Sequence, residues 1–147
     1  MSQEFAEQAA QIYRTPSALQ AFNDDIVEQF RTNQGQIVSG PLAGAALLLM
    51  TVAGELVPLA YVPDGAGLVI VASKGGSPDN PGWYDAVLAE PQVDIEVGVE
   101  SFRARVTEAT GAERDRLYAA VVAALPVFAD YAAKTTRVIP VLVLHRI

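Results

Sequence analysis

The most constraining feature of the sequence is the run 71–91, in which an apolar stretch ends in Ser73-Lys74-Gly75-Gly76 and a helix signal follows at Asn80-Pro81. Glycines permit backbone conformations at positive φ and let other groups approach the main chain closely. Successive backbone N–H groups in such a turn, and those at a helix start, attract anions. The run predicts a buried strand, a turn and a helix. With Lys74 and the ring of Trp83 beside it, this arrangement suits an anionic ligand with a flat ring.

Each part of this run also has a purely structural interpretation. Glycine turns with an exposed lysine are common between a strand and a helix, so Lys74 by itself does not establish a ligand site. Trp83 and Tyr84 could stack on a ring, but aromatic side chains mostly supply buried area, which favours core packing. Arg137 and Lys134, near the last strand, are interpreted as surface charges.

Composition narrows the classes of function. The 147 residues form one ordinary domain, 51% of them hydrophobic, and the net charge of −7 argues against general nucleic-acid binding. There is no cysteine, which excludes disulfides and thiolate catalysis. The lone His145 near the end of the sequence gives no partner for a catalytic dyad or a zinc site. Without a phosphate-loop or dinucleotide motif either, an enzyme of this kind depends on a bound cofactor.

The sequence predicts a cytoplasmic protein without a membrane span. Residues 1–4 are polar and lack an apolar signal region, and the apolar stretch 41–53 is too short to span a bilayer. The helix expected after Thr15 carries acidic residues, Asp24, Asp25 and Glu28, on its polar face. Such a face favours a helix that covers the domain over one that lies on a membrane, although peripheral membrane contact stays open.

Periodicity predicts a small α+β, barrel-like domain over residues 1–147, with a helical segment over residues 1–35. Helices are expected at 16–33, 81–88 and 111–124, and a short helix is expected after Leu125-Pro126 through Lys134. A weaker signal predicts a helix through Phe5, Ala9 and Tyr13. Strands are expected at 46–52, 57–62, 68–72, 93–97, 102–108 and 138–144. The first three are expected to be antiparallel, and the next two to form a hairpin around Gly98. Thr110 and Glu113 match a capping box, and Pro140 inside the last strand indicates an edge or a bulge. Trp83, Val87 and Leu88 are expected to point partly inward.

Several segments together resemble the deazaflavin (coenzyme F-420)-dependent nitroreductase family, which comprises oxidoreductases of the split β-barrel type. The resemblance runs from about Phe22 to Leu144, and the segments occur in order at family-like spacing. They are Gly40-Pro41-Leu42-Ala43-Gly44, Val57-Pro58-Leu59-Ala60-Tyr61, Val71-Ala72-Ser73-Lys74-Gly75-Gly76, Asn80-Pro81-Gly82-Trp83-Tyr84, Phe128-Ala129-Asp130-Tyr131 and Thr135-Thr136-Arg137-Val138-Ile139-Pro140-Val141.

The resemblance implies an FMN-binding-like split barrel of about six mainly antiparallel strands. Its implied activity is hydride transfer from reduced deazaflavin to a small electron-poor substrate, such as a quinone, an unsaturated lactone or a nitro compound. The residues implied to bind the cofactor are Pro58, Leu59, Ser73, Lys74, Gly75, Gly76 and Trp83. The implied substrate pocket contains Leu125, Phe128 and Tyr131, and Tyr131 is the candidate catalytic residue. The assembly is expected to be a monomer or a homodimer.

The sequence departs from the family between the first two strands, where a basic loop is usual. Here the chain reads Val52-Ala53-Gly54-Glu55-Leu56, about five residues shorter and without a cation. Either two strands join directly through a true deletion, or a mobile basic loop is missing between Thr51 and Val57; the family-like flanks favour the second. In addition, Ala86 stands where the family's helix usually has an amide.

Two rival functions stay open at this point. One is an FMN-dependent oxidoreductase of the same barrel class. The other is a non-catalytic protein that sequesters a deazaflavin, a flavin or a lipid-like ligand, which the short loop favours more than a normal family member would.

Overall fold

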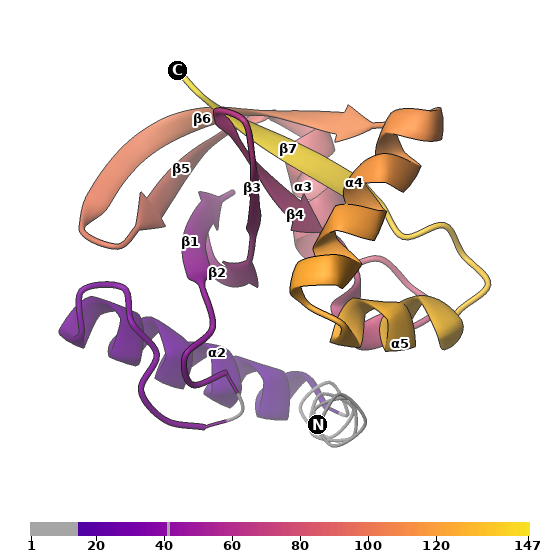
Figure 1. Cartoon of the computed structure of the whole chain (residues 1–147). Helices are drawn as coiled ribbons and strands as arrows, with labels where there is room; N and C mark the ends of the chain where they lie inside the picture. The colour runs from indigo at the N-terminus through magenta and orange to yellow at the C-terminus, as the bar shows by residue number, and fades with distance from the viewer. Residues whose placement is uncertain (1–14, 41) are drawn as a thin grey trace.

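The computed structural model describes residues 15–40 and 42–147, and within them seven antiparallel strands form one sheet, ordered β2-β1-β5-β6-β7-β4-β3. The sheet curls around an interior core, so that β2 at one edge contacts β4 near the other edge (Figure 1). The expected α+β class is confirmed, with seven strands where about six were predicted. The helix expected around Phe5, Ala9 and Tyr13 lies outside the described residues.

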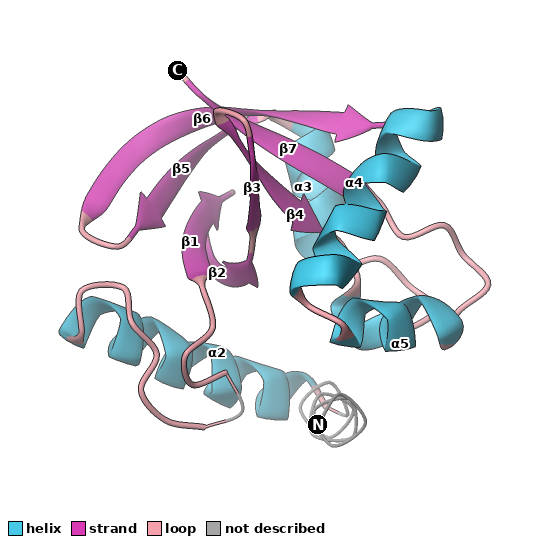
Figure 2. Cartoon of the chain, viewed as in Figure 1, coloured by secondary structure: helices cyan, strands magenta, loops and turns pink. Residues whose placement is uncertain are grey.

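The described elements have the following bounds. The strands are β1 (Leu47–Val52), β2 (Glu55–Ala60), β3 (Val62–Asp64), β4 (Gly67–Val71), β5 (Gln92–Val97), β6 (Glu100–Ala109) and β7 (Val141–Arg146). The helices are α2 (Pro16–Thr32), α3 (Gly82–Ala89), α4 (Gly111–Ala124), α5 (Val127–Ala133) and the short 3₁₀ helix η1 (Lys74–Gly76). Figure 2 shows that α2 lies apart from α4 and α5, on a different side of the sheet.

Helix α2 begins and ends close to where the sequence predicts. The Thr15 side chain accepts a hydrogen bond from the Ala18 N–H at 3.1 Å, which satisfies one of the donors left free at a helix start. Ile26 and Phe30 are buried against the outer face of β1, where they contact a cluster that includes Leu49. The helix therefore covers the sheet, as its acidic polar face predicts.

The β1–β2 connection is a tight two-residue turn. Val52 pairs with Glu55, and the residues between them, Ala53 and Gly54, have φ angles of 50° and 77°. Two successive residues at positive φ are typical of the hairpin turns whose twist matches the strands. Residues 51–57 are consecutive in the full sequence and the turn joins the two strands directly, so the interpretation that a basic loop is missing here is wrong.

Of the three apolar runs between residues 46 and 72, the first two pair with each other as β1 and β2, but the third pairs with neither of them. Strand β2 ends at Ala60, and the short β3 that follows pairs with β4, while β4 also pairs with β7. Periodicity identifies strands but contains no information about their partners, which long-range packing selects.

The last strand also starts later than predicted. Strand β7 begins at Val141 and lies between β6 and β4 in the middle of the sheet. Pro140 precedes it, and its carbonyl accepts a hydrogen bond from the Ala72 N–H at 3.0 Å. Pro140 is therefore outside the ladder, where its missing N–H costs nothing, and the prediction of an edge strand or a bulge is wrong.

Side chains on the concave face form one interior cluster, which α3 closes. Val87 of α3 is fully buried there, and the partly buried Trp83 packs against the same cluster. Leu88 is 50% exposed, so its predicted inward position is wrong. The β5–β6 hairpin around Gly98 is confirmed. Residues that alternate along its second strand, Phe102, Ala104 and Val106, belong to this cluster, as period-two alternation predicts.

The opposite face of β4 and β7 carries an outer cluster, which α4 and α5 cover. Val71 and Val141 pack there against Leu117, Val121 and Tyr131 of these helices. The capping box predicted at the start of α4 is wrong. Thr110 occupies the cap position without a side-chain hydrogen bond, and the Glu113 carboxylate accepts hydrogen bonds from Arg116 instead.

Candidate anion-binding site

The Ser73–Gly76 segment forms a turn with an unusual backbone. Ser73 lies in the right-handed helical region at φ −82° and ψ −36°, and Lys74, Gly75 and Gly76 follow with φ of 47°, 64° and 81°. A right-handed residue followed by a left-handed one directs successive N–H groups into a concavity that binds anions. Lys74 adopts positive φ although it has a Cβ, which costs about 1–2 kcal/mol. Strain of this kind concentrates at functional sites.

The hydrogen bonds inside the turn leave part of the concavity available. The Gly76 N–H donates to the Ser73 carbonyl at 3.0 Å, and the Ser77 N–H donates to the Lys74 carbonyl at 3.2 Å. The N–H groups of Ser73, Lys74 and Gly75 take no part in these bonds. They are the donors that an anion could accept from.

Helix α5 packs directly on this turn, and Gly76 makes that contact possible. A Cβ at Gly76 would meet the backbone oxygen of Tyr131 at 2.8 Å and its Cα at 3.0 Å, both closer than packing allows. The Cβ of Lys134 would lie 3.1 Å from the same position. The tertiary structure therefore brings Lys134, which the sequence suggests is an ordinary surface charge, beside the predicted turn.

Both lysines of the chain stand at this site. Lys74 is half-buried in the turn and Lys134 is exposed beside it, and neither joins an ion pair among the described residues. In a chain with a net charge of −7, these two lysines bring positive charge to the turn, although the carboxylate of Asp79 is close enough to act on Arg137.

Arg137 is the site residue that sequence reasoning missed. Its guanidinium donates to the Ser77 carbonyl at 2.9 Å, the Ser73 carbonyl at 2.8 Å and the Ala72 carbonyl at 3.3 Å. It also donates to the Asn80 side-chain oxygen at 2.8 Å. Asn80 lies just before α3, whose cap position is held by Pro81. These partners are 57–65 residues away in sequence, so no local pattern could have revealed them.

The positive charges of two arginines near the outer cluster act on the pKa of Tyr118. Burial raises the pKa of the Tyr118 hydroxyl, and the charges of Arg114 and Arg137 oppose that increase. The hydroxyl donates a hydrogen bond of 2.6 Å to the Phe128 carbonyl, which ties α4 to α5.

The predicted cofactor-lining residues outside the turn do not all share one face. Leu59 and Trp83 both pack against the interior cluster. Pro58 pairs with Leu49, whose side chain lies on the outer face under α2, so the Pro58 side chain points away from Leu59. The two side chains therefore lie on opposite faces of β2, and the cofactor-binding roles of Pro58 and Leu59 stay predictions.

The residues expected to form the substrate pocket lie around α5. Tyr131 is 5% exposed and packs edge-to-face against Phe128, with ring centroids 5.3 Å apart. Leu125 ends α4, just before α5. Of the three, only Tyr131 is shown to contact the turn, at Gly76. Phe128 and Tyr131 belong to the outer cluster, whereas Leu59 and Trp83 pack against the interior cluster, and the role of all three toward a substrate stays a prediction.

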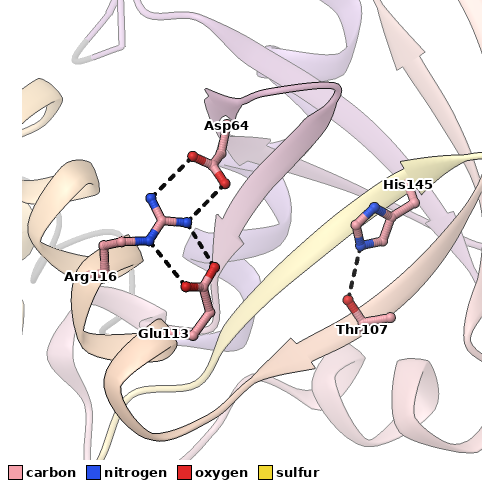
Figure 3. A network of polar contacts seen from close by, with 5 residues as sticks. All are labelled: Asp64, Thr107, Glu113, Arg116 and His145. Atoms are coloured by element: carbon pink, nitrogen blue, oxygen red, sulfur yellow. Dashed lines mark hydrogen bonds and ion pairs between the residues drawn. The ribbon is translucent and has the colours of Figure 1, made fainter.

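A second polar region lies on another face. Asp64, Glu113 and Arg116 form an exposed ion-pair network, and Thr107 contacts His145 at 3.1 Å between Oγ1 and Nε2 (Figure 3). These residues, apart from Arg116, belong to the lining of a concavity of about 350 Å³ that also includes Glu108. Its three carboxylates make it unsuitable for an anionic cofactor.

In residues 15–40 and 42–147 there is no group of three or more side chains placed to hold a metal ion. Among the described helices, none combines the length and the apolar character that crossing a membrane requires.

Comparisons with known proteins place this fold and turn in a family. An F420H(2)-dependent quinone reductase of Mycobacterium tuberculosis is 37% identical over 116 residues, covering 72% of this chain and 76% of that protein. A solved F420-H2-dependent reductase, FDR-A, matches with a TM-score of 0.63 and 34% identity over 68% of this chain and 94% of its own. Another solved structure, described as a domain-swapped dimer, matches with a TM-score of 0.65 and 30% identity, covering 86% of this chain and 98% of its own.

These similarities confirm the split-barrel class that the resemblance implies. The sequence model of the F420H(2)-dependent quinone reductases matches residues 24–146, which include the whole curled sheet and the Ser73–Gly76 turn. The chain therefore belongs to the F420H(2)-dependent quinone reductase family.

Proposed function

We propose that this protein is an F420H2-dependent reductase that transfers a hydride from reduced deazaflavin to a quinone. The observation that carries the proposal is the concavity of N–H groups at Ser73, Lys74 and Gly75, beside two unpaired lysines. Those donors fit a phosphate, which the deazaflavin cofactor has. Family membership supplies the deazaflavin and quinone chemistry.

In this proposal the residues bind and orient, while the cofactor, when bound, supplies the hydride. Lys74 pairs with the phosphate, and the N–H groups of Lys74 and Gly75 donate to its oxygens. Leu59 and Trp83 provide apolar surface for the ring. A quinone that accepts one hydride must also gain one proton to become a hydroquinone, and Tyr131 or a water delivers that proton.

Substitution of Lys74 tests the binding step. Lys74→Ala should weaken F420 binding by roughly 1.5–3 kcal/mol, or about 10- to 150-fold in dissociation constant, because one charged hydrogen-bonding partner is lost. Fluorescence titration measures this, and affinity should fall with added salt. Arg105→Ala is the matched control, since Arg105 is an exposed cation on β6 away from the turn. An unchanged dissociation constant for Lys74→Ala would rule the role out.

Substitution of Tyr131 tests proton delivery. Tyr131→Phe should lower quinone turnover about 10²-fold or more when proton donation limits the rate, while F420 affinity stays nearly constant. Tyr84→Phe serves as the control, because Tyr84 lies on α3 and hydrogen-bonds Glu108. Equal turnover for Tyr131→Phe and wild type would show that the hydroxyl is dispensable.

One observation favours a second candidate, an FMN-dependent oxidoreductase. The Ala53–Gly54 turn carries no cation, whereas the family's basic loop at this point helps to hold the longer anionic tail of the deazaflavin. FMN ends in a single phosphate that the turn alone could bind. Parallel titrations with F420 and FMN separate the two cofactors. Steady-state turnover with a naphthoquinone separates either enzyme from a protein that only sequesters its ligand.

A further inference from the structure

We propose that Arg137 is a positioning residue, which holds the Ser73–Gly76 turn in its anion-binding conformation from behind. The identity of the anion as a cofactor phosphate rests on the proposed function. The positioning role rests on the hydrogen bonds of Arg137 in the structure itself.

The first step of the argument is the direction of the peptide groups. Arg137 binds the carbonyls of Ala72 and Ser73, two consecutive residues. The described chain has no cis peptide bond, and in a trans peptide the C=O and the following N–H point in opposite directions. The N–H groups of Ser73 and Lys74 therefore point away from Arg137. The bonds that fix the carbonyls also direct the donors.

The second step is the stability of the backbone conformation. The turn contains Lys74 at positive φ, which persists only when the surrounding structure imposes it. Arg137 bridges both ends of the turn, because it binds the carbonyl of Ser73 at its start and that of Ser77 just after it. A lysine in place of Arg137 could not span these acceptors, since only the planar guanidinium presents five donors in a fixed fork.

The third step is electrostatic. Among the residues that the structure describes, Arg137 binds no carboxylate directly, although the charge of Asp79 is close enough to act on it. Burial lowers the pKa of Arg137, but a guanidinium stays charged at any physiological pH. A cation bound to a carbonyl polarises that peptide group and strengthens its N–H as a donor. The charge of Arg137 thus reaches the anion through the two peptide units.

The test uses Arg137→Lys, which keeps the charge, with Arg114→Lys as the matched control. Arg114 also donates to a backbone carbonyl, that of Ile139, but makes no bond to residues 72–80. Arg137→Lys should weaken F420 binding about tenfold or more, with kcat at saturating cofactor unchanged. Arg114→Lys should stay within about twofold of wild type.

A measurement on the free protein keeps the inference separate from the proposed function. Amide hydrogen exchange at Gly76 and Ser77 should be faster in Arg137→Lys than in Arg114→Lys, because these N–H groups close the turn. Inorganic phosphate should shift the amide resonances of Ser73, Lys74 and Gly75 in wild type and less in Arg137→Lys. Failure of the wild-type protein to bind F420 would contradict the proposed function alone. The hydrogen-exchange and phosphate measurements would still test the role of Arg137.

Asn80→Ala provides a second variant in case Arg137→Lys folds poorly. It removes one exposed partner of the guanidinium and should weaken phosphate and F420 binding about two- to fivefold. Wild-type exchange and wild-type affinity in folded Arg137→Lys would overturn the inference. So would a loss of affinity as large in Arg114→Lys as in Arg137→Lys.

Discussion

Arg137 and Arg116 differ in the kind of acceptor that their guanidinium groups bind. Arg137 is half-buried and donates to three backbone carbonyls and one amide oxygen. Arg116 is exposed and donates to the carboxylates of Asp64 and Glu113 (Figure 3). The charge of Arg116 is therefore neutralised by its partners, whereas the charge of Arg137 has no directly bound carboxylate. Of these two arginines, only Arg137 has its guanidinium bound to carbonyl and amide oxygens instead of carboxylates.

The pKa values of two tyrosines, Tyr84 near Glu108 and Tyr118 near Arg137, are affected by opposite charges. Burial first, and then the hydrogen bond from its hydroxyl to Glu108, raises the pKa of Tyr84 to about 12. Around Tyr118, the arginines act in the opposite direction to burial. The carboxylate of Glu108 thus acts on Tyr84 in the opposite direction from the arginines on Tyr118. In a chain with a net charge of −7, function depends on this local separation of charge.

The largest expected difference between the regions is in the tolerance of an added Cβ. Gly76→Ala should lower the free energy of unfolding by roughly 2–5 kcal/mol, because it adds a backbone clash with Tyr131 to the cost of positive φ. Gly65→Ala, in the β3–β4 turn next to Asp64, has positive φ but open space, and should cost about 1–2 kcal/mol. Denaturant unfolding measures both. Equal losses would mean that the α5 contact at Gly76 is not tight.

A smaller difference is expected between the arginines. Arg137→Met should lower the free energy of unfolding by roughly 1–3 kcal/mol, since it leaves partly buried carbonyls without donors. Arg116→Met should change it much less, because exposed ion pairs are screened by solvent and their side chains are costly to order. Chemical denaturation at low and high salt checks this comparison. A greater loss for Arg116→Met would contradict the structural distinction between the two sites.

The smallest expected effect is a dependence on pH from Tyr84. Its folded pKa of about 12 lies above the ordinary value of about 10, so the fold favours the neutral phenol. This contribution to stability is fully present below about pH 10 and is lost as the pH rises to about 12. Unfolding measured across that window should show a weaker pH dependence in Tyr84→Phe than in wild type. The same slope in both proteins would exclude Tyr84 as its source.

Local signals in the sequence determined several elements correctly. The Thr15 cap and the apolar spacing of Ile26 and Phe30 predict α2, and alternation around Gly98 predicts the β5–β6 hairpin. The glycines after Lys74 predict a turn with positive φ, which the structure has. Each of these depends on sterics and hydrogen bonds between residues close in the chain, so the sequence alone was sufficient.

The tertiary structure decided what distant residues do to one another. Three features depend on partners that are distant or that compete with the local sequence pattern. They are the strand order, the position of Pro140 before β7, and the hydrogen bonds of the Glu113 carboxylate with Arg116 in place of a helix cap. Most of the candidate site has this origin, because Lys134 and Arg137 reach the turn only through the packing of α5 and the segment that leads into β7. A sequence pattern specifies which groups can donate and accept hydrogen bonds. Which groups meet is settled by long-range burial and chain closure, whose free energies no short pattern contains.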